Sequence, residues 1–261
     1  MGAPPDVLLT ERVGAHLLLV TLNRPQRRNA IDAALAAALA QAVRMAEQDE
    51  AIRAVVLTGT GGRCFCAGAD LEEVAAGRGG ALSVGGDGLG GFIHARRAKP
   101  WIAALRGAAV GGGLELALAC EMIVAGEDAS LALPEVRRGL LAGAGGVYRL
   151  PRALPRALAL EMLLTGAPMP AIRAHAYGMV NHVVPDERVV SCALDLAQAI
   201  ADNAPLAVRA SLALARDAHA QPDDRLRARM EAAIGQLGTT ADAREGVAAF
   251  IEKRSPRWTD R

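Results

Sequence analysis

The chain has 261 residues, 52% of them hydrophobic and 22% charged, a composition that suits a globular protein and excludes wholesale disorder. Its 29 basic and 28 acidic residues leave a formal net charge of +1, so no overall attraction to nucleic acid or to an anionic membrane is expected. Only 3% of the residues are aromatic, which leaves few side chains on which bases could stack. We therefore expect neither a nucleic-acid partner nor a membrane partner.

Strands and helices alternate along the first two hundred residues, which predicts an α/β fold. A helix is expected over residues 30–49, with Asn29 or Asp32 as its N-cap, and an apolar helix from the glycines at 111–113 to Cys120. The predicted strands cover residues 16–22, 53–58, 101–105, 121–125 and 130–133.

Two segments depart from this alternation. Residues 77–91 carry glycine at eight of fifteen positions, which predicts a mobile loop that is either a surface insertion or a flap over a ligand site. Strand signals end at residue 203, and helices are predicted over residues 204–219 and 224–253. We therefore expect a core over residues 1–202 and a helical C-terminal region over residues 203–261.

The cysteines and the N-terminus bear on the compartment. None of Cys64, Cys66, Cys120 and Cys192 forms a C-x-x-C pair, so no zinc or thioredoxin-type motif is predicted. The first residues lack a basic segment followed by an apolar one, so no secretory signal is expected. These features predict reduced thiols and a cytoplasmic protein without a resident metal.

The glycines at 111–113 open a helix, and Glu115 follows them in the apolar run LELALAC. The first amides of a helix lack partners within it, so this position suits an oxyanion; close helix–strand packing is the alternative. A carboxylate in an apolar run is expensive to bury unless it is paired or functional. The same choice applies to Glu135, because Arg137 and Arg138 are close enough in sequence to pair with it.

Six motifs follow one another along the chain: LNRPQRRNAID, GGRCFCAGADL, KPWIAALRGAAVGGGLELALACE, LALPEVRRGLLAGAGGVYRLPR, AHAYGMVNHVVP and EGVAAFIEKRSPRW. In this order they resemble the crotonase superfamily of enoyl-CoA hydratases and isomerases, from about residue 16 to the C-terminus. The resemblance implies a crotonase-type spiral of ββα units with a helical C-terminal trimerisation region, hence a homotrimer or a dimer of trimers.

The resemblance also implies roles for individual residues. The backbone amides of Ala69 and Gly112 would bind the thioester carbonyl of an acyl-CoA, Glu115 would help activate a water, and Glu135 would supply a proton to C2. Coenzyme A is then part of the substrate, and no other cofactor is implied. The positions expected to contact the substrate or its CoA are Gln26, Arg27, Arg28, Ala67, Asp70, Leu71, Phe250 and Lys253.

Retention of both glutamates favours an enoyl-CoA hydratase of fatty-acid or related acyl-CoA degradation. The alternatives are a Δ3-Δ2-enoyl-CoA isomerase, a carnitinyl-type dehydratase, and a non-catalytic acyl-CoA or RNA-binding module that uses the Arg24, Arg27 and Arg28 patch. Three features depart from the usual family pattern and put the substrate in doubt: Ala142 replaces a proline, Glu72 replaces a lysine, and the 77–91 loop matches no known pattern. The histidines are scattered (His16, His94, His175, His182 and His219), and we expect structural or surface roles for them.

Overall fold

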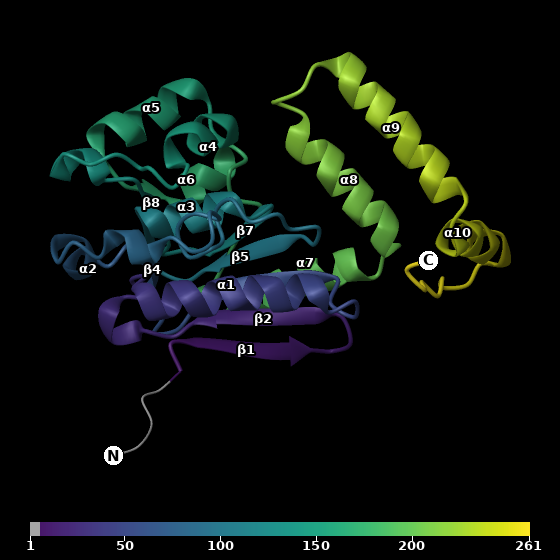
Figure 1. Ribbon diagram of the computed structural model, residues 1–261, viewed down its shortest axis with the longest axis horizontal. Helices are drawn as coiled ribbons and strands as arrows, with labels where there is room; N and C mark the ends of the chain where they lie inside the picture. Colours follow the sequence, from purple (N-terminus) through teal and green to yellow (C-terminus); the bar gives the residue numbers. More distant parts are fainter. Residues whose placement is uncertain (1–5) are drawn as a thin grey trace.

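Two β-sheets form the centre of the computed structural model, which describes residues 6–261 (Figure 1). The larger sheet has the strand order β1-β2-β3-β5-β7-β10; β1 is antiparallel to β2, and the other neighbours are parallel. The strands β3 and β5 are buried at every position, as expected for apolar strands at the centre of a parallel sheet. The six strands are β1 (Leu8–Val13), β2 (Leu17–Leu22), β3 (Ala54–Gly59), β5 (Trp101–Leu105), β7 (Met122–Gly126) and β10 (His182–Val184).

The smaller sheet shows why the chain forms a spiral. Its order is β4-β6-β8-β9, and β3, β5 and β7 of the larger sheet are each followed directly by one of its strands. The chain thus repeatedly passes from one sheet to the other, which confirms the predicted crotonase-type architecture. The strands are β4 (Cys64–Cys66), β6 (Ala108–Val110), β8 (Ser130–Ala132) and β9 (Met169–Pro170).

Helices cover both faces of the larger sheet. Helix α1 (Ala33–Gln48) packs Leu35 and Leu39 into the main core, while α7 (Val189–Ala201) packs Ala193 and Ala197 into a second cluster on β3, β5 and β7. The shorter helices lie around this core. They are η1 (Pro25–Arg27), α2 (Leu71–Ala75), η2 (Gly79–Leu82), α3 (Gly112–Ala119), η3 (Glu135–Arg138), α4 (Gly146–Ala153), α5 (Arg156–Thr165), α6 (Ala171–Ala176) and η4 (Asp186–Arg188).

The last three helices lie outside the two sheets, on one side of the molecule (Figure 1). They are α8 (Pro205–Asp217), α9 (Asp223–Gly238) and α10 (Ala241–Glu252). The single helix expected over residues 224–253 is wrong, because α9 ends at Gly238 and Thr240 is extended and caps α10. The Thr240 side chain accepts a hydrogen bond from the amide of Ala243 at 3.0 Å. The division of the chain after residue 202 falls between α7 and α8 and stays a prediction. Over residues 6–261, no helix combines the length and the apolar character that a membrane crossing needs.

The five predicted strands are confirmed to within two residues, and Asp32 is the N-cap of α1, since its carboxylate accepts from the Leu35 amide at 2.8 Å. Asn29 has a different role. It is fully buried with a φ of 54°, and its side-chain amide donates to the carbonyls of Thr60, Cys64 and Phe65 at 3.0–3.1 Å. Asn29 therefore joins the segment before α1 to the end of β3 and to β4.

We expect Asn29→Ala to lower the free energy of unfolding by about 3 kcal/mol, because it leaves buried carbonyl groups without a donor. Chemical denaturation checks this value. Asn203→Ala is the matched control, since Asn203 is exposed and its amide serves only carbonyls of its own helix end. Equal destabilisation by the two variants would contradict the role assigned to Asn29.

Candidate active site

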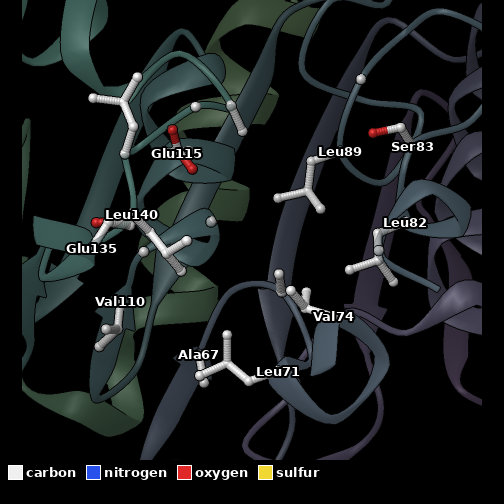
Figure 2. Close-up of a pocket in the computed structure, with 18 of the residues that line it drawn as sticks. Ala67, Leu71, Val74, Leu82, Ser83, Leu89, Val110, Glu115, Glu135 and Leu140 are labelled. Atoms are coloured by element: carbon white, nitrogen blue, oxygen red, sulfur yellow. The ribbon is translucent and has the colours of Figure 1, made fainter. Parts of the chain in front are cut away.

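A cavity of about 520 Å³ lies between α2 and the 77–91 loop on one side and α3, η3 and the segment after η3 on the other (Figure 2). Leucine and valine side chains from both sides line it, and Glu115 and Glu135 stand together on the α3 side (Figure 2). Six of the residues expected from the sequence line this cavity: Ala67, Ala69, Leu71, Gly112, Glu115 and Glu135. The spiral thus brings together positions that are up to 68 residues apart in the chain.

Backbone packs directly on backbone where the loop after β4 meets the start of α3. A Cβ atom on Gly112 would lie 3.2 Å from the Cα of Gly68 and 3.3 Å from the nitrogen of Ala69. A Cβ on Gly68, whose φ is +88°, would lie 2.7 Å from the nitrogen of Gly112. Only glycine permits this approach at these two positions, so the Ala69 and Gly112 nitrogens lie close together at the cavity wall.

Both of these amides belong to residues that line the cavity. Within residues 6–261, neither the Ala69 nor the Gly112 nitrogen donates a backbone or side-chain hydrogen bond. Gly112 is the first residue of α3, where amides lack helical partners and carry the positive end of the helix dipole. Two such donors in one wall suit an oxygen that gains negative charge. The packing alternative also holds for Gly113, because a Cβ there would lie 2.0 Å from the carbonyl oxygen of Cys66.

Glu115 lies one turn further along α3 than Gly112 and is only 3% exposed. Its Oε1 accepts a hydrogen bond from the amide of Gly146, the first residue of α4, at 2.8 Å. Burial raises the pKa of Glu115 to about 7, and the negative charge of Glu135 acts in the same direction against the opposing Gly146 amide. The Glu115 carboxyl group therefore changes between its protonated and its charged form near neutral pH.

Glu135 is half-buried at the start of η3. Its Oε2 is enclosed and has no hydrogen-bond partner in the described part of the chain. Burial raises its pKa, while the positive charge of Arg138 opposes the shift. The salt-bridge alternative is wrong for Glu115 and Glu135, because no ion pair between residues 6 and 261 includes either of them. The arrangement places two unpaired carboxyl groups beside two open amides.

Comparison with known proteins shows the family. A sequence profile described as enoyl-CoA hydratase/isomerase matches residues 12–261. The chain belongs to the enoyl-CoA hydratase/isomerase family. It is 38% identical to enoyl-CoA hydratase EchA19 of Mycobacterium tuberculosis over 98% of this chain and 97% of the relative. It is 39% identical to the carnitinyl-CoA dehydratase of Salmonella enteritidis over 94% and 95% of the two chains.

A solved structure agrees with this assignment. The crystal structure of an enoyl-CoA hydratase from Mycobacterium tuberculosis H37Rv superposes with a TM-score of 0.94 at 41% identity, covering 98% of this chain and all of that one. The predicted resemblance to the crotonase superfamily is therefore confirmed, and the chain is an enzyme of the hydro-lyase type.

Of the residues expected to contact the substrate or its CoA in this enoyl-CoA hydratase family member, Ala67 and Leu71 line the cavity, whereas Gln26, Arg27 and Arg28 do not. Gln26, Arg27 and Arg28 are exposed on and after η1. The carbonyl of Arg28 accepts from the amide of Ala67 at 3.0 Å, which places this segment against the Ala67 end of the cavity. Their contact with CoA stays a prediction.

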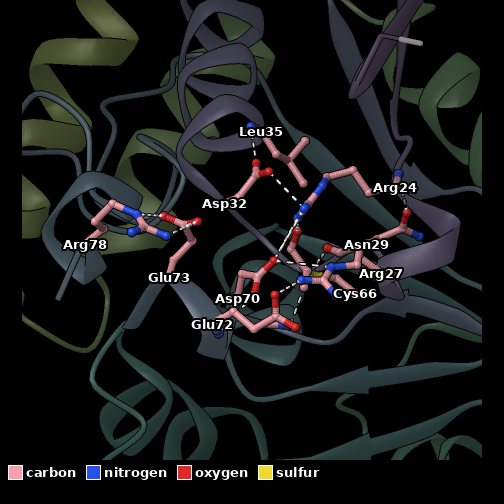
Figure 3. A network of polar contacts seen from close by, with 12 residues as sticks. Arg24, Arg27, Asn29, Asp32, Leu35, Cys66, Asp70, Glu72, Glu73 and Arg78 are labelled. Atoms are coloured by element: carbon pink, nitrogen blue, oxygen red, sulfur yellow. Dashed lines mark hydrogen bonds and ion pairs between the residues drawn. The ribbon is translucent and has the colours of Figure 1, made fainter. Parts of the chain in front are cut away.

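Asp70 contacts other residues of the protein rather than the cavity (Figure 3). It is buried, its Oδ1 accepts from the Glu72 amide at 3.2 Å and so caps α2, and its Oδ2 lies 3.3 Å from Arg24 Nη1. The structure therefore gives Asp70 the role of holding the Ala69 loop in place. It does not line the cavity, whereas its neighbours Ala69 and Leu71 do.

Phe250 and Lys253 lie apart from the rest of the expected site. They belong to α10 and its C-cap, at the opposite end of the longest axis of the molecule from α2 (Figure 1). Phe250 is 85% exposed. Within one chain these two residues do not reach the cavity, so the predicted contact with CoA requires a neighbouring copy.

Several lining residues were missed by the sequence analysis. His94, expected to be structural or on the surface, lines the cavity with Arg138, Leu140 and Leu141. His94 lies outside the quoted motifs, whereas the other three lie within LALPEVRRGLLAGAGGVYRLPR. A single sequence does not show which positions of that motif face the cavity. The 77–91 loop also lines the cavity, through residues such as Leu82, Ser83 and Leu89, as the flap alternative expects; its mobility stays a prediction. Within residues 6–261, no cluster of three histidine, cysteine or acidic side chains is arranged to hold a metal.

The raised pKa of Glu115 predicts a pH-dependent stability. A carboxyl with a higher pKa in the folded state binds its proton more tightly there, so its contribution is present below about pH 4.5 and is lost as the pH rises through about 7. Relative to wild type, Glu115→Gln should therefore gain about 3 kcal/mol of unfolding free energy between pH 4.5 and 8. Denaturant titrations at both pH values measure it. The exposed Glu50→Gln should show no such gain, and a pH-independent difference for Glu115→Gln would refute the assignment.

Proposed function

We propose that the protein adds water across the C2–C3 double bond of a 2-enoyl-CoA thioester and forms a 3-hydroxyacyl-CoA, in fatty-acid or related acyl-CoA degradation. The observation that carries the proposal is one cavity lined by Glu115, Glu135 and two residues, Ala69 and Gly112, whose amides donate no hydrogen bond within residues 6–261. The reverse reaction, loss of water from a 3-hydroxyacyl-CoA, uses the same groups. An enoyl-CoA hydratase and a carnitinyl-CoA dehydratase among the relatives fit this chemistry.

The two amides act on the thioester oxygen. Attack of water at C3 moves electrons toward that oxygen, and the Ala69 and Gly112 N–H groups donate to it as its negative charge grows. One such preorganised donor typically contributes about 2.7–4 kcal/mol of transition-state stabilisation. Because both donors belong to tightly packed backbone, they need no rearrangement during the reaction.

The two carboxyl groups move the protons. Glu115 accepts a proton from the attacking water, the hydroxyl oxygen bonds to C3, and Glu135 gives a proton to C2. The pair starts with its one proton on Glu135 and ends with it on Glu115, so its total charge does not change. The shared burial that raises both pKa values supports a pair that holds one proton near neutral pH.

The positions of the CoA moiety and of the acyl chain follow from the place of the two amides in the cavity. We assign the CoA moiety to the Ala67 end of the cavity, beside Gln26, Arg27 and Arg28, and the acyl chain to the apolar side chains. Phe250 and Lys253 would act on the CoA of a neighbouring copy in a homotrimer or a dimer of trimers. The four cysteines are free thiols, which suits the cytoplasm as the proposed compartment.

Glu115→Gln and Glu135→Gln should each lower kcat for hydration of a short 2-enoyl-CoA by at least about 10²-fold, since each removes a proton acceptor or donor. Loss of the conjugated enoyl-thioester absorbance measures the rate. Glu50→Gln controls for removal of an exposed carboxylate. A near-wild-type rate in either active-site variant would defeat the hydratase proposal, and a gain of that absorbance from a 3-enoyl-CoA would identify an isomerase instead.

The pH dependence of kcat/KM tests the shared proton. Above about pH 7 the pair loses its proton, so kcat/KM should fall by about tenfold per pH unit. The fall should be absent from the residual activity of Glu135→Gln, because that variant has no donor proton to lose. A profile that stays flat to pH 9 in the wild type would show that the pair does not need its proton.

A further inference from the structure

Arg24, Arg27 and Arg28 lie near the Ala67 end of the cavity, and their partners differ. Figure 3 shows the contacts of Arg24 and Arg27. Arg24 is committed to the fold: its Nη1 donates to the carbonyl of Ala30, and its Nη2 lies 2.9 Å from Oδ2 of Asp32. Its side chain is only 11% exposed. Arg24 is therefore unable to turn toward a ligand without breaking the entry to α1.

Arg28, unlike Arg24, has a guanidinium group that is not used by the fold of the described residues. It is exposed, and no ion pair or side-chain hydrogen bond within residues 6–261 uses its guanidinium group. Its own carbonyl is bonded to Ala67, which lines the cavity. Arg28 thus stands at the edge of the cavity with its charge available.

Arg27 is held by an acidic residue that is itself exposed. Its Nη2 donates to Oε2 of Glu72, and its Nε lies 3.9 Å from Oδ2 of Asp70 (Figure 3). Glu72 lies in the first turn of α2, directly after the cavity-lining Leu71, and its side chain is 73% exposed. An exposed ion pair of this kind contributes little to stability and exchanges readily for another anion.

We propose that Glu72 competes with the phosphate groups of the CoA substrate for Arg27, and so sets how strongly the enzyme binds the nucleotide end of its thioester. This inference rests on the proposed function. In the free protein the Glu72 carboxylate occupies the Arg27 guanidinium. When a CoA thioester enters, a phosphate replaces that carboxylate on Arg27 and joins the open charge of Arg28. Glu72 then remains beside the phosphates as a repulsive charge.

The test compares substrates with and without phosphate groups. Glu72→Gln should lower KM for a short 2-enoyl-CoA by about three- to tenfold, because it removes both the competitor and the repulsion. KM for the matching 2-enoyl-pantetheine, which has no phosphate, should stay within twofold. The charge-matched control is Glu73→Gln, since Glu73 lies next to Glu72 but pairs with Arg78 at 2.8 Å. An unchanged KM for the CoA thioester, or equal shifts for both thioesters or both variants, would overturn the proposal.

Arg27→Gln completes a double-mutant cycle. It should raise KM for the CoA thioester, and in its background Glu72→Gln should lose most of its effect. Undiminished tightening in that background would show that Glu72 does not act through Arg27.

Calorimetric titration with coenzyme A alone separates this inference from the proposed function. If no thioester is hydrated, the function falls, yet tighter coenzyme A binding by Glu72→Gln still supports the competition. Equal affinity of Glu72→Gln and wild type for coenzyme A would overturn the competition, whatever the catalytic result.

Discussion

The structure depends on a backbone-to-backbone contact between the end of β4 with its loop and the first turn of α3. Glycine at 68, 112 and 113 removes the Cβ atoms that would hold these segments apart, and a Cβ at Gly113 would fall 2.0 Å from the carbonyl oxygen of Cys66. The contact seals the smaller sheet against α3 and leaves two amides side by side. It also determines the place of Glu115, which follows Gly112 by three residues.

Burial of the two carboxyl groups raises their pKa values and also costs folding free energy. Among residues 6–261, neither Glu115 nor Glu135 forms an ion pair, and the Gly146 amide donates to Oε1 of Glu115. A desolvated carboxyl group has a raised pKa because its charged form is less stable there than in water. The spiral supplies the compensating energy through the apolar packing of its sheets and of α1 and α7.

Much of the fold and the centre of the site could be predicted from the sequence. Apolar runs identified β3 and β5 because such patterns are local, and the ordered motifs identified the residues around Glu115. The break at Thr240 was missed because a capping hydroxyl competes with an otherwise helical pattern. His94 and Arg138 were missed because only the tertiary path of the chain brings them to the cavity. Asp70 belongs to a motif, but its partner Arg24 is 46 residues away, so its supporting role needed the structure.

Asn29 has a consequence beyond stability. Its side-chain amide joins the segment that carries Arg28 to β4, and β4 leads into the loop of Ala69. The part of the protein that would hold the distant nucleotide and the part that would polarise the carbonyl are thus one rigid unit. Binding energy from contacts with the nucleotide would then help to align the reacting carbons, and so would raise kcat rather than only lower KM.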